Sequence, residues 1–428
     1  MYCIVPGVYF IVLVNVTVLT TNYLLIMEPI IINDYCFKRV YFWMQYTPED
    51  LNFTEIAMDV YYPKDRKANG LVMFNHGFMI GPDLFYLPKR LLTALFSNEP
   101  PPLFANYPSY FYNYTSAIAE KNWAMAFVTS THKQNEFTPT TDFGGNPRVG
   151  QEAYLAASYL ICFGATSTFF NASRSKQFQF MNSNNVIFAG HSVGGAHAQV
   201  AATGFDNLRA IGEQTKQKFD PIVYDRVAFP RVTDKLSKWG EENQAKPVGL
   251  VQLSPVDMKN PLFGGMKAYR EKLKTIAIPN LMVVGQCDCA CLDTSQPPAW
   301  SCDSSVVTEY SQMAPAASDS WATVASVEKG SHCGYLTAPS EICSTADSSA
   351  SCKRCPDTEK YKPVGKESDF TAELFKRFID IYPANSEFAG TRQDWLGSSC
   401  LKWLNNKNPA DTAINLVPFS DGKYVYHV

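Results

Sequence analysis

The sequence lacks an excess of charge of either sign. Lys and Arg total 37, Asp and Glu total 40, and only 18% of the 428 residues are charged. Without a basic run to neutralise phosphates, the chain is not expected to bind nucleic acid. Its 24 Gly and 27 Pro are ordinary usage, which excludes collagen-like and low-complexity proteins. The length is ample for a sizeable core, arranged as one large domain or two ordinary ones.

Cysteine pairs with the spacing of a metal site are also scarce, although the chain has twelve cysteines. Eight of them lie between Cys287 and Cys355, but only Cys352 and Cys355 form the C-x-x-C pair typical of structural zinc sites. We therefore expect disulfides rather than a metal site, and no cofactor. Such crowding of cysteines is typical of proteins that fold in an oxidising compartment. The pairing is not determined by the sequence.

No charged residue precedes Glu28. Residues 4–14 form an apolar stretch of the length of a signal-peptide core, but a basic flank and an A-x-A cleavage site are missing. Residues 4–27 could instead span a bilayer, although Pro6 and Asn15 weaken that interpretation. We expect residues 1–27 to be a signal peptide or a membrane anchor. The protein is then secreted or extracellular, with membrane anchoring as the alternative and membrane contact through this segment.

Downstream, short apolar runs alternate with stretches of helical periodicity. Buried strands that alternate with helices predict an α/β fold, with a mostly parallel, doubly wound sheet. In such sheets ligands bind beyond the carboxyl ends of the strands. The expected strands are residues 71–74, 124–128, 186–189, 248–253, 281–284 and 323–327, and the expected helices are residues 88–96, 148–163, 194–202 and 369–382.

This alternation defines a main domain over residues 28–385. Residues 205–247 interrupt it between a helix and a strand, with mixed charge and aromatics, and we expect this insertion to form a cap over the site. Residues 386–428 form a C-terminal extension, which a bond through Cys400 could tie back to the domain.

Residues 190–194 have the sequence G-H-S-V-G, a G-x-S-x-G motif directly after the expected strand 186–189. A serine on a sharp strand-to-helix turn has a strained backbone, and glycine neighbours allow strand and helix to approach closely. The turn exposes the hydroxyl and directs the N-terminus of the next helix at developing negative charge. Ser192 is therefore the candidate nucleophile. The alternative is an ordinary Gly/Ser turn before a helix.

An oxyanion hole requires two backbone N–H donors. One is expected from Val193, directly after the serine, and the second from Phe78, directly after His76 and Gly77 at the end of the strand 71–74. Gly77 allows the chain to turn so that this N–H points inward. The alternative for His76 is a hydrogen-bonded histidine at a strand end.

Serine needs a general base, and His332 is the favoured one among six histidines. It follows the last expected strand and is flanked by small residues. From a loop it can reach the strand-to-helix turn that carries Ser192, which is called the elbow below. The other five belong to the two loops above, to the helix after the elbow, to a polar loop before the serine or to the chain end: His76, His191, His197, His132 and His427.

The carboxylate that orients the base is expected between serine and histidine in chain order. Asp288, three residues beyond Gly285 at the end of a strand, is the favoured acid. Asp257 follows the previous strand, and Asp293 lies further along the same loop as Asp288; both remain alternatives. A solvated surface carboxylate is the other interpretation of each.

With these stretches in this order, the chain resembles the α/β-hydrolase family, and within it the branch of dienelactone hydrolases, chlorophyllases and polyester hydrolases. The resemblance implies an esterase with Ser192, Asp288 and His332 as its catalytic triad. The chain departs from that branch in the C-x-C-x-C run around Asp288, in the insertion and in the extension. In some chlorophyllase-like members the acid follows the earlier strand, which keeps Asp257 open. The matching stretches are residues 75–78, 190–195, 285–288 and 330–332.

The predicted function is hydrolysis of a small-molecule or lipid-like carboxylic ester through an acyl-enzyme. A thioesterase or acyltransferase would use the same residues, and a catalytically silent hydrolase fold that serves in recognition is the alternative from another class. An aromatic stretch could line an apolar pocket, or could equally be ordinary packing of a loop. It comprises Phe104, Tyr107, Tyr110, Phe111, Tyr112 and Tyr114.

Overall fold

A computed structural model describes fourteen segments of the chain. They are residues 29–51, 53–77, 108–130, 148–165, 179–224, 235–255, 276, 278–285, 322–327, 331–336, 366–382, 398–405, 414–420 and 423–424.

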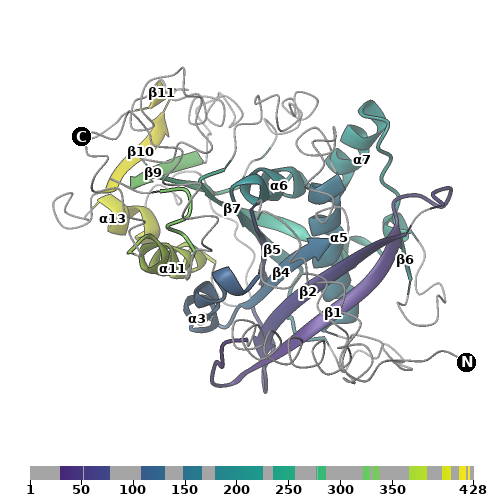
Figure 1. The fold of residues 1–428 in the computed structure, drawn as a ribbon, viewed down its shortest axis with the longest axis horizontal. Helices are drawn as coiled ribbons and strands as arrows, with labels where there is room; N and C mark the ends of the chain where they lie inside the picture. The colour runs from purple at the N-terminus through teal and green to yellow at the C-terminus, as the bar shows by residue number, and fades with distance from the viewer. Residues whose placement is uncertain are drawn as a thin grey trace, which may run out of the picture.

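These residues form one eleven-stranded sheet in the order β11-β10-β9-β8-β7-β5-β3-β4-β2-β1-β6 (Figure 1). Six neighbouring strands at the centre of the sheet run parallel, in the order β9, β8, β7, β5, β3 and β4. The strands at both edges are antiparallel. The strands are β1 (Tyr35–Gln45), β2 (Thr54–Pro63), β3 (Leu71–Asn75), β4 (Ala124–Ser130), β5 (Asn185–His191), β6 (Ile222–Tyr224), β7 (Lys246–Leu253), β8 (Asn280–Gly285), β9 (Ala322–Val327), β10 (Ile414–Ser420) and β11 (Lys423–Tyr424).

The predicted α/β class and mostly parallel sheet are confirmed. All six expected strands are present as β3, β4, β5, β7, β8 and β9. The antiparallel pair β1 and β2 was not predicted. Every residue of β3 and β5 is buried, as expected for strands covered by helices on both faces.

Helices cover both faces of the sheet (Figure 1). Along β5, Val186 and Phe188 belong to the core beneath α5, α6 and α7, whereas Ile187 and Ala189 belong to the core beneath α3, α11 and α13. This alternation follows from the two-residue period of a strand. The helices are α3 (Asn113–Ala119), α5 (Arg148–Phe163), α6 (Val193–Ala201), α7 (Phe205–Gln214), α11 (Lys366–Ile379) and α13 (Ser399–Asn405), with short 3₁₀ turns η1 (Pro108–Phe111), η3 (Leu236–Lys238) and η4 (Glu241–Asn243).

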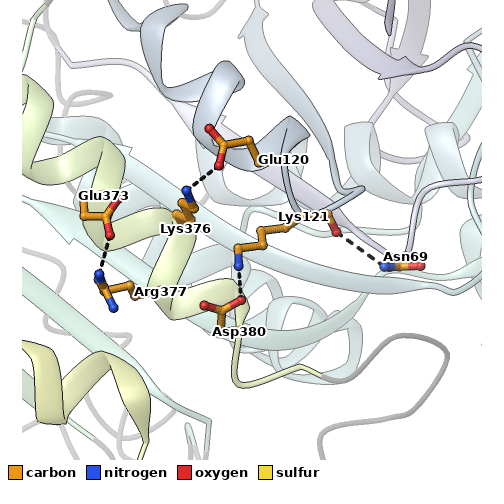
Figure 2. A network of polar contacts seen from close by, with 7 residues as sticks. All are labelled: Asn69, Glu120, Lys121, Glu373, Lys376, Arg377 and Asp380. Atoms are coloured by element: carbon orange, nitrogen blue, oxygen red, sulfur yellow. Dashed lines mark hydrogen bonds and ion pairs between the residues drawn. The ribbon is translucent and has the colours of Figure 1, made fainter. Parts of the chain in front are cut away.

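Helices α3 and α11 pack side by side and are joined by charged side chains at one end (Figure 2). Glu120 at the end of α3 pairs with Lys376 of α11, and Lys121 Nζ lies 2.5 Å from Asp380 Oδ1. Within α11, Arg377 pairs with Glu373 at 2.7 Å. All these side chains are at least a quarter exposed, so each pair is expected to contribute little to the stability of the fold.

The described part of the 205–247 insertion contains α7 and β6, whereas residues 225–234 lie outside the described residues, so the cap over the site stays a prediction. Helix α7 buries Leu208 and Ile211 in the core beneath α5, and β6 adds to the edge of the sheet by pairing with β1. Four strands separate β6 from β5, the strand that leads to Ser192. The described residues of this segment therefore widen the sheet and cover one of its faces. The physical reason is the apolar character of one side of α7, which needs a core to bury it.

The C-terminal extension joins the same sheet, because β10 pairs antiparallel with β9. Cys400 of α13 has a free thiol, so the expected bond through this residue is wrong. The thiol is fully buried with Leu404 in the core beneath α11, and burial raises its pKa. The described part of the extension is thus held by packing and strand pairing.

No helix of the described part of the chain is long and apolar enough to cross a membrane. The expected signal peptide or anchor, residues 1–27, lies outside the described residues.

Candidate active site

Ser192 lies on the turn between β5 and α6, with φ 57° and ψ −128°. This conformation suits glycine, and holding a serine in it costs about 1–3 kcal/mol. The Ser192 backbone N–H donates to the carbonyl oxygen of Leu253 in β7 at 2.9 Å, and its side chain is 4% exposed. The expected sharp turn between strand and helix is therefore present, and the neighbouring strand supports its strained backbone.

Two glycines of the elbow lie where any side chain would collide with backbone. A Cβ on Gly190 would lie 2.2 Å from the Gly194 oxygen, and a Cβ on Gly194 would lie 2.1 Å from the oxygen of Asn75. Real Cβ atoms do not approach this closely, so both positions require glycine. The expectation that small neighbours let strand and helix approach is confirmed.

The end of β3 lies beside the elbow. Asn75 is opposite Gly190 in the parallel register, and a Cβ built on Gly77 would lie 2.7 Å from Ser192 Cβ. The ring of His76 is buried, and its Nδ1 lies 2.7 Å from the Gly77 oxygen. The His-Gly turn thus contacts the candidate nucleophile, while Phe78, the expected second oxyanion donor, lies outside the described residues.

Val193, the other expected oxyanion donor, is the first residue of α6. Helix N-termini have backbone N–H groups without intrahelical partners and a partial positive charge. The N–H groups of Gly195 and Ala196 donate to the backbone carbonyl oxygen of Ser192 at 3.0 and 3.4 Å. An anion placed over the Ser192 hydroxyl would thus meet the positive end of α6.

His332 lies in a described segment without helix or strand, residues 331–336, that follows β9 after a gap in the described residues. Its ring centroid is 4.7 Å from that of His191, the residue directly before Ser192. The His332 side chain is half-buried. Residues 140 positions apart in the sequence, the candidate nucleophile and the candidate base, are thus brought to the same edge of the sheet.

The loop that holds His332 is fixed by hydrogen bonds from three other elements. His191 Nε2 in β5 lies 2.6 Å from the His332 oxygen, and Tyr114 of α3 donates its hydroxyl to the Tyr335 oxygen. The Ser254 hydroxyl, after β7, donates to the Tyr335 hydroxyl oxygen at 3.4 Å. These partners hold the backbone of His332 itself and both the backbone and the side chain of Tyr335, three residues later.

The candidate acids Asp257, Asp288 and Asp293 all lie outside the described residues. The strands that precede them end at Leu253 (β7) and Gly285 (β8), at the same edge of the sheet as the elbow. Among the residues that the structure describes, no three His, Cys, Asp or Glu side chains are grouped to hold a metal ion.

Three of the four described residues of the aromatic stretch lie in the core. Phe111 and Tyr114 are fully buried against Phe74 of β3, at ring-centroid distances of 4.7 and 6.0 Å. Tyr112 donates to the Asp59 carboxylate; burial and this carboxylate raise the pKa of the phenol. Ordinary packing therefore describes these three residues. Tyr110 is half-buried, and Phe104 and Tyr107 lie outside the described part of the chain.

The sequence places His191 in the turn before Ser192 but indicates no role for it. In the structure its ring contacts the ring and the backbone oxygen of His332, the candidate base. The signal in the sequence was the two-residue period of β5. It places the His191 side chain on the same face as Ile187 and Ala189, the face on which α3 and α11 pack. The sequence held no signal for its partner, which is 141 positions away.

No family model matches the chain, and no curated protein matches it. Among solved structures it is similar to dienelactone hydrolase from Anabaena variabilis ATCC 29413, with 11% identity over 82% of this chain and 99% of that one and a TM-score of 0.37. It is also similar to an acylaminoacyl peptidase from Pyrococcus horikoshii, with 12% identity over 84% of this chain and a TM-score of 0.41, and it spans only 44% of that peptidase. The esterase domain of a Rhodothermus marinus protein is 12% identical over 81% of this chain and 99% of that one, with a TM-score of 0.35.

These values indicate similarity in outline only. The assignment of the fold rests on the sheet itself, whose parallel centre delivers a serine on a strained strand-to-helix elbow. That arrangement is the α/β-hydrolase type of fold.

Proposed function

We propose that this protein is a serine hydrolase that cleaves carboxylic esters, with Ser192 as nucleophile and His332 as general base. The observation that supports this most strongly is the strained backbone of Ser192 at φ 57°, ψ −128° between β5 and α6. Strain of this kind persists only where the surrounding structure maintains it, and it clusters at functional sites. An ordinary turn before a helix has no need of it.

In the proposed reaction, His332 takes the proton of the Ser192 hydroxyl as the oxygen attacks the acyl carbon. The alcohol leaves with a proton from His332, and a water molecule then hydrolyses the acyl-enzyme with His332 again as base. The backbone N–H groups of Val193 and Phe78 stabilise the oxyanion, each worth roughly 10²–10³ in rate. No step requires a metal or cofactor.

Asp288 is the proposed acid that holds the imidazole in its tautomer, with Asp257 and Asp293 as the alternatives. Replacement of each by Asn separates them, because loss of the true acid lowers kcat by about 10⁴ whereas a surface carboxylate is nearly neutral. If D288N keeps full activity and D257N loses it, the acid follows β7 instead of β8.

Entry into the secretory pathway through residues 1–27, cleaved or retained as an anchor, is part of the proposal. Cys333, directly after the proposed base, is disulfide-bonded, which supports an oxidising compartment. Disulfides near the base would hold its loop, so mild reductant should lower activity before the fold is lost. Full activity after complete reduction would contradict this.

A fluorophosphonate probe tests the enzyme assignment directly, because it phosphonylates an activated serine and ignores an inert one. Wild-type protein should be labelled at Ser192, and Ser192→Ala should lose both labelling and turnover. Ser183→Ala is the matched control, because Ser183 precedes the opposite end of β5 and its hydroxyl bonds to the Asn69 oxygen. Unlabelled wild type would indicate a catalytically silent module.

The substrate class is then narrowed with p-nitrophenyl esters of increasing chain length, together with matched thioesters. Preference for an ester over its thioester, and a maximum at one chain length, would define the acyl group. Faster turnover of the thioester would make the protein a thioesterase on the same residues. Acyl transfer to an added alcohol at the expense of hydrolysis would indicate an acyltransferase.

A further inference from the structure

The side chain of His191 is buried between the two loops that the proposed mechanism must bring together. It is 2% exposed, and its ring lies 5.6 Å from that of Phe111, 5.7 Å from that of Tyr335 and 4.7 Å from that of His332, between centroids. From the third side, Nδ1 would lie 3.0 Å from a Cβ on Gly77. The ring therefore has little room to turn.

One nitrogen of this ring meets the backbone of the proposed base. His191 Nε2 lies 2.6 Å from the carbonyl oxygen of His332. A carbonyl oxygen only accepts, so Nε2 must carry the hydrogen. Nε2 is a donor both in the neutral Nε2–H tautomer and in the imidazolium, so this bond is compatible with either of these two states of the ring.

The bond joins the residue before the nucleophile to the residue of the base itself. The sheet alone does not fix this relation, because β7 and β8 separate β5 from β9, and His332 lies on a loop beyond β9. A misplacement of about 1 Å between reacting groups can cost 10²-fold in rate. A direct bond from the elbow to the His332 backbone removes that freedom.

We propose that His191 is a positioning residue: its Nε2–H holds the His332 backbone at a fixed distance from the Ser192 elbow. This rests on the proposed serine-hydrolase function. His191 touches no substrate; it acts through His332 only.

Two substitutions separate the hydrogen bond from simple packing. H191F keeps a ring of similar volume and removes the donor, whereas the side-chain amide of H191Q can place an N–H close to the position of Nε2. We expect H191F to lower kcat and the rate of fluorophosphonate labelling between about 10-fold and 100-fold, with KM changed less than twofold. H191Q should recover most of both rates.

H197F is the matched control, because His197 is a second buried histidine, in α6, five residues beyond the nucleophile. We expect it to lower the melting temperature while the labelling rate of the folded protein and its pH profile stay as in wild type. Equal rates for H191F and wild type, or equal losses in H191F and H191Q, would overturn the positioning role. If wild type itself is not labelled, the serine-hydrolase proposal fails, which is a different result.

A measurement that does not depend on activity completes the test. In wild-type protein labelled with ¹⁵N-histidine, the Nε2 of His191 should carry a slowly exchanging proton across pH 5 to 8. The spectrum of H191Q, which lacks this signal, assigns it. A proton found on Nδ1 with Nε2 bare would overturn the proposal, because that tautomer has nothing to donate to the His332 carbonyl.

Discussion

The two faces of the sheet are packed in different ways. Beneath α5 and α6 the core is rich in small residues and the helices approach closely: a Cβ on Gly150 of α5 would lie 2.6 Å from Val200 of α6. Beneath α3 and α11 the core is rich in rings, and Tyr114 and Tyr382 donate buried hydroxyl hydrogen bonds to distant backbone. Buried tyrosine hydrogen bonds occur on both faces: Tyr154 on the first donates to the Ala245 oxygen, and Tyr114 on the second donates to the loop that holds His332.

This difference matches the way each face supports the site. The elbow of Ser192 is fixed by its own backbone, by two obligatory glycines and by strand register. The His332 loop is fixed by side chains that reach it from β5, α3 and the end of β7. The proposed nucleophile is thus positioned mainly by residues close to it in the sequence, whereas the proposed base depends on residues far away in the sequence.

The largest loss of stability should come from adding a side chain at a glycine of the elbow. Gly194→Ala would place a methyl group 2.1 Å from the backbone oxygen of Asn75, which only a backbone shift relieves. We expect more than about 4 kcal/mol of destabilisation, or no folded protein. Gly204→Ala is the control, because its Cβ meets nothing within 4 Å and only the backbone angles, φ 84° and ψ 169°, disfavour alanine. It should cost about 1–3 kcal/mol in urea unfolding; equal costs would contradict the steric argument.

The pH profile should separate the nucleophile from the base. Serine does not titrate near neutrality, whereas His332 must be neutral to accept a proton. Protonation as the pH falls below about 6.5, the ordinary histidine value, should lower kcat/KM tenfold per unit, to about a hundredth at pH 4.5. A profile that is flat down to pH 4 in protein that remains folded by circular dichroism would exclude His332 as the base.

A matched pair of tyrosines tests whether the polar contacts of one face matter to the reaction. Tyr114→Phe removes the hydroxyl that donates to the Tyr335 oxygen, and Tyr154→Phe removes a buried hydroxyl that donates to the Ala245 oxygen at 2.7 Å on the other face. Each should destabilise by about 1–3 kcal/mol, because a buried carbonyl loses its donor. Only Tyr114→Phe should also lower kcat, by severalfold. Equal activities would show that the loop holds without this bond.

The smallest effect is expected at the surface between α3 and α11 (Figure 2). Lys121→Gln removes the ion pair with Asp380 but keeps the backbone oxygen of residue 121, which accepts from Asn69 Nδ2 at 3.4 Å. Because both charges are partly exposed, we expect less than about 1 kcal/mol in unfolding free energy and no change in kcat. A larger loss would mean that this pair positions α11.

Much of the centre of the fold could be predicted from the sequence. Apolar runs bounded by turn residues predicted β3, β5 and β7, and helical periodicity predicted α5 within the observed bounds. The edges could not be predicted in this way, because β1 begins with five half-buried residues in a row and most of β2 is buried, so neither strand shows a two-residue alternation of burial. The short strand β6 is defined only by its partner β1.

Within the candidate site the same division holds. Ser192 was evident because the strand, the glycines and the helix that strain it are contiguous. The suggested disulfide through Cys400 was wrong, because the sequence does not distinguish a buried free thiol from a cysteine that forms a disulfide. The contact of His191 with His332 could not be predicted. The residues around a histidine do not show whether its ring donates a hydrogen bond to a backbone oxygen 141 positions away or only packs in the core.

By itself the sequence determined the elements whose causes are local: the central strands, the strained elbow and the small residues that it requires. The tertiary structure alone decided which distant groups meet at the end of β5, because a contact between loops depends on how many strands separate them and on which face each side chain lies. Strand alternation determines the face of His191, but only the assembled sheet and the helices packed on it brought the His332 backbone to that ring.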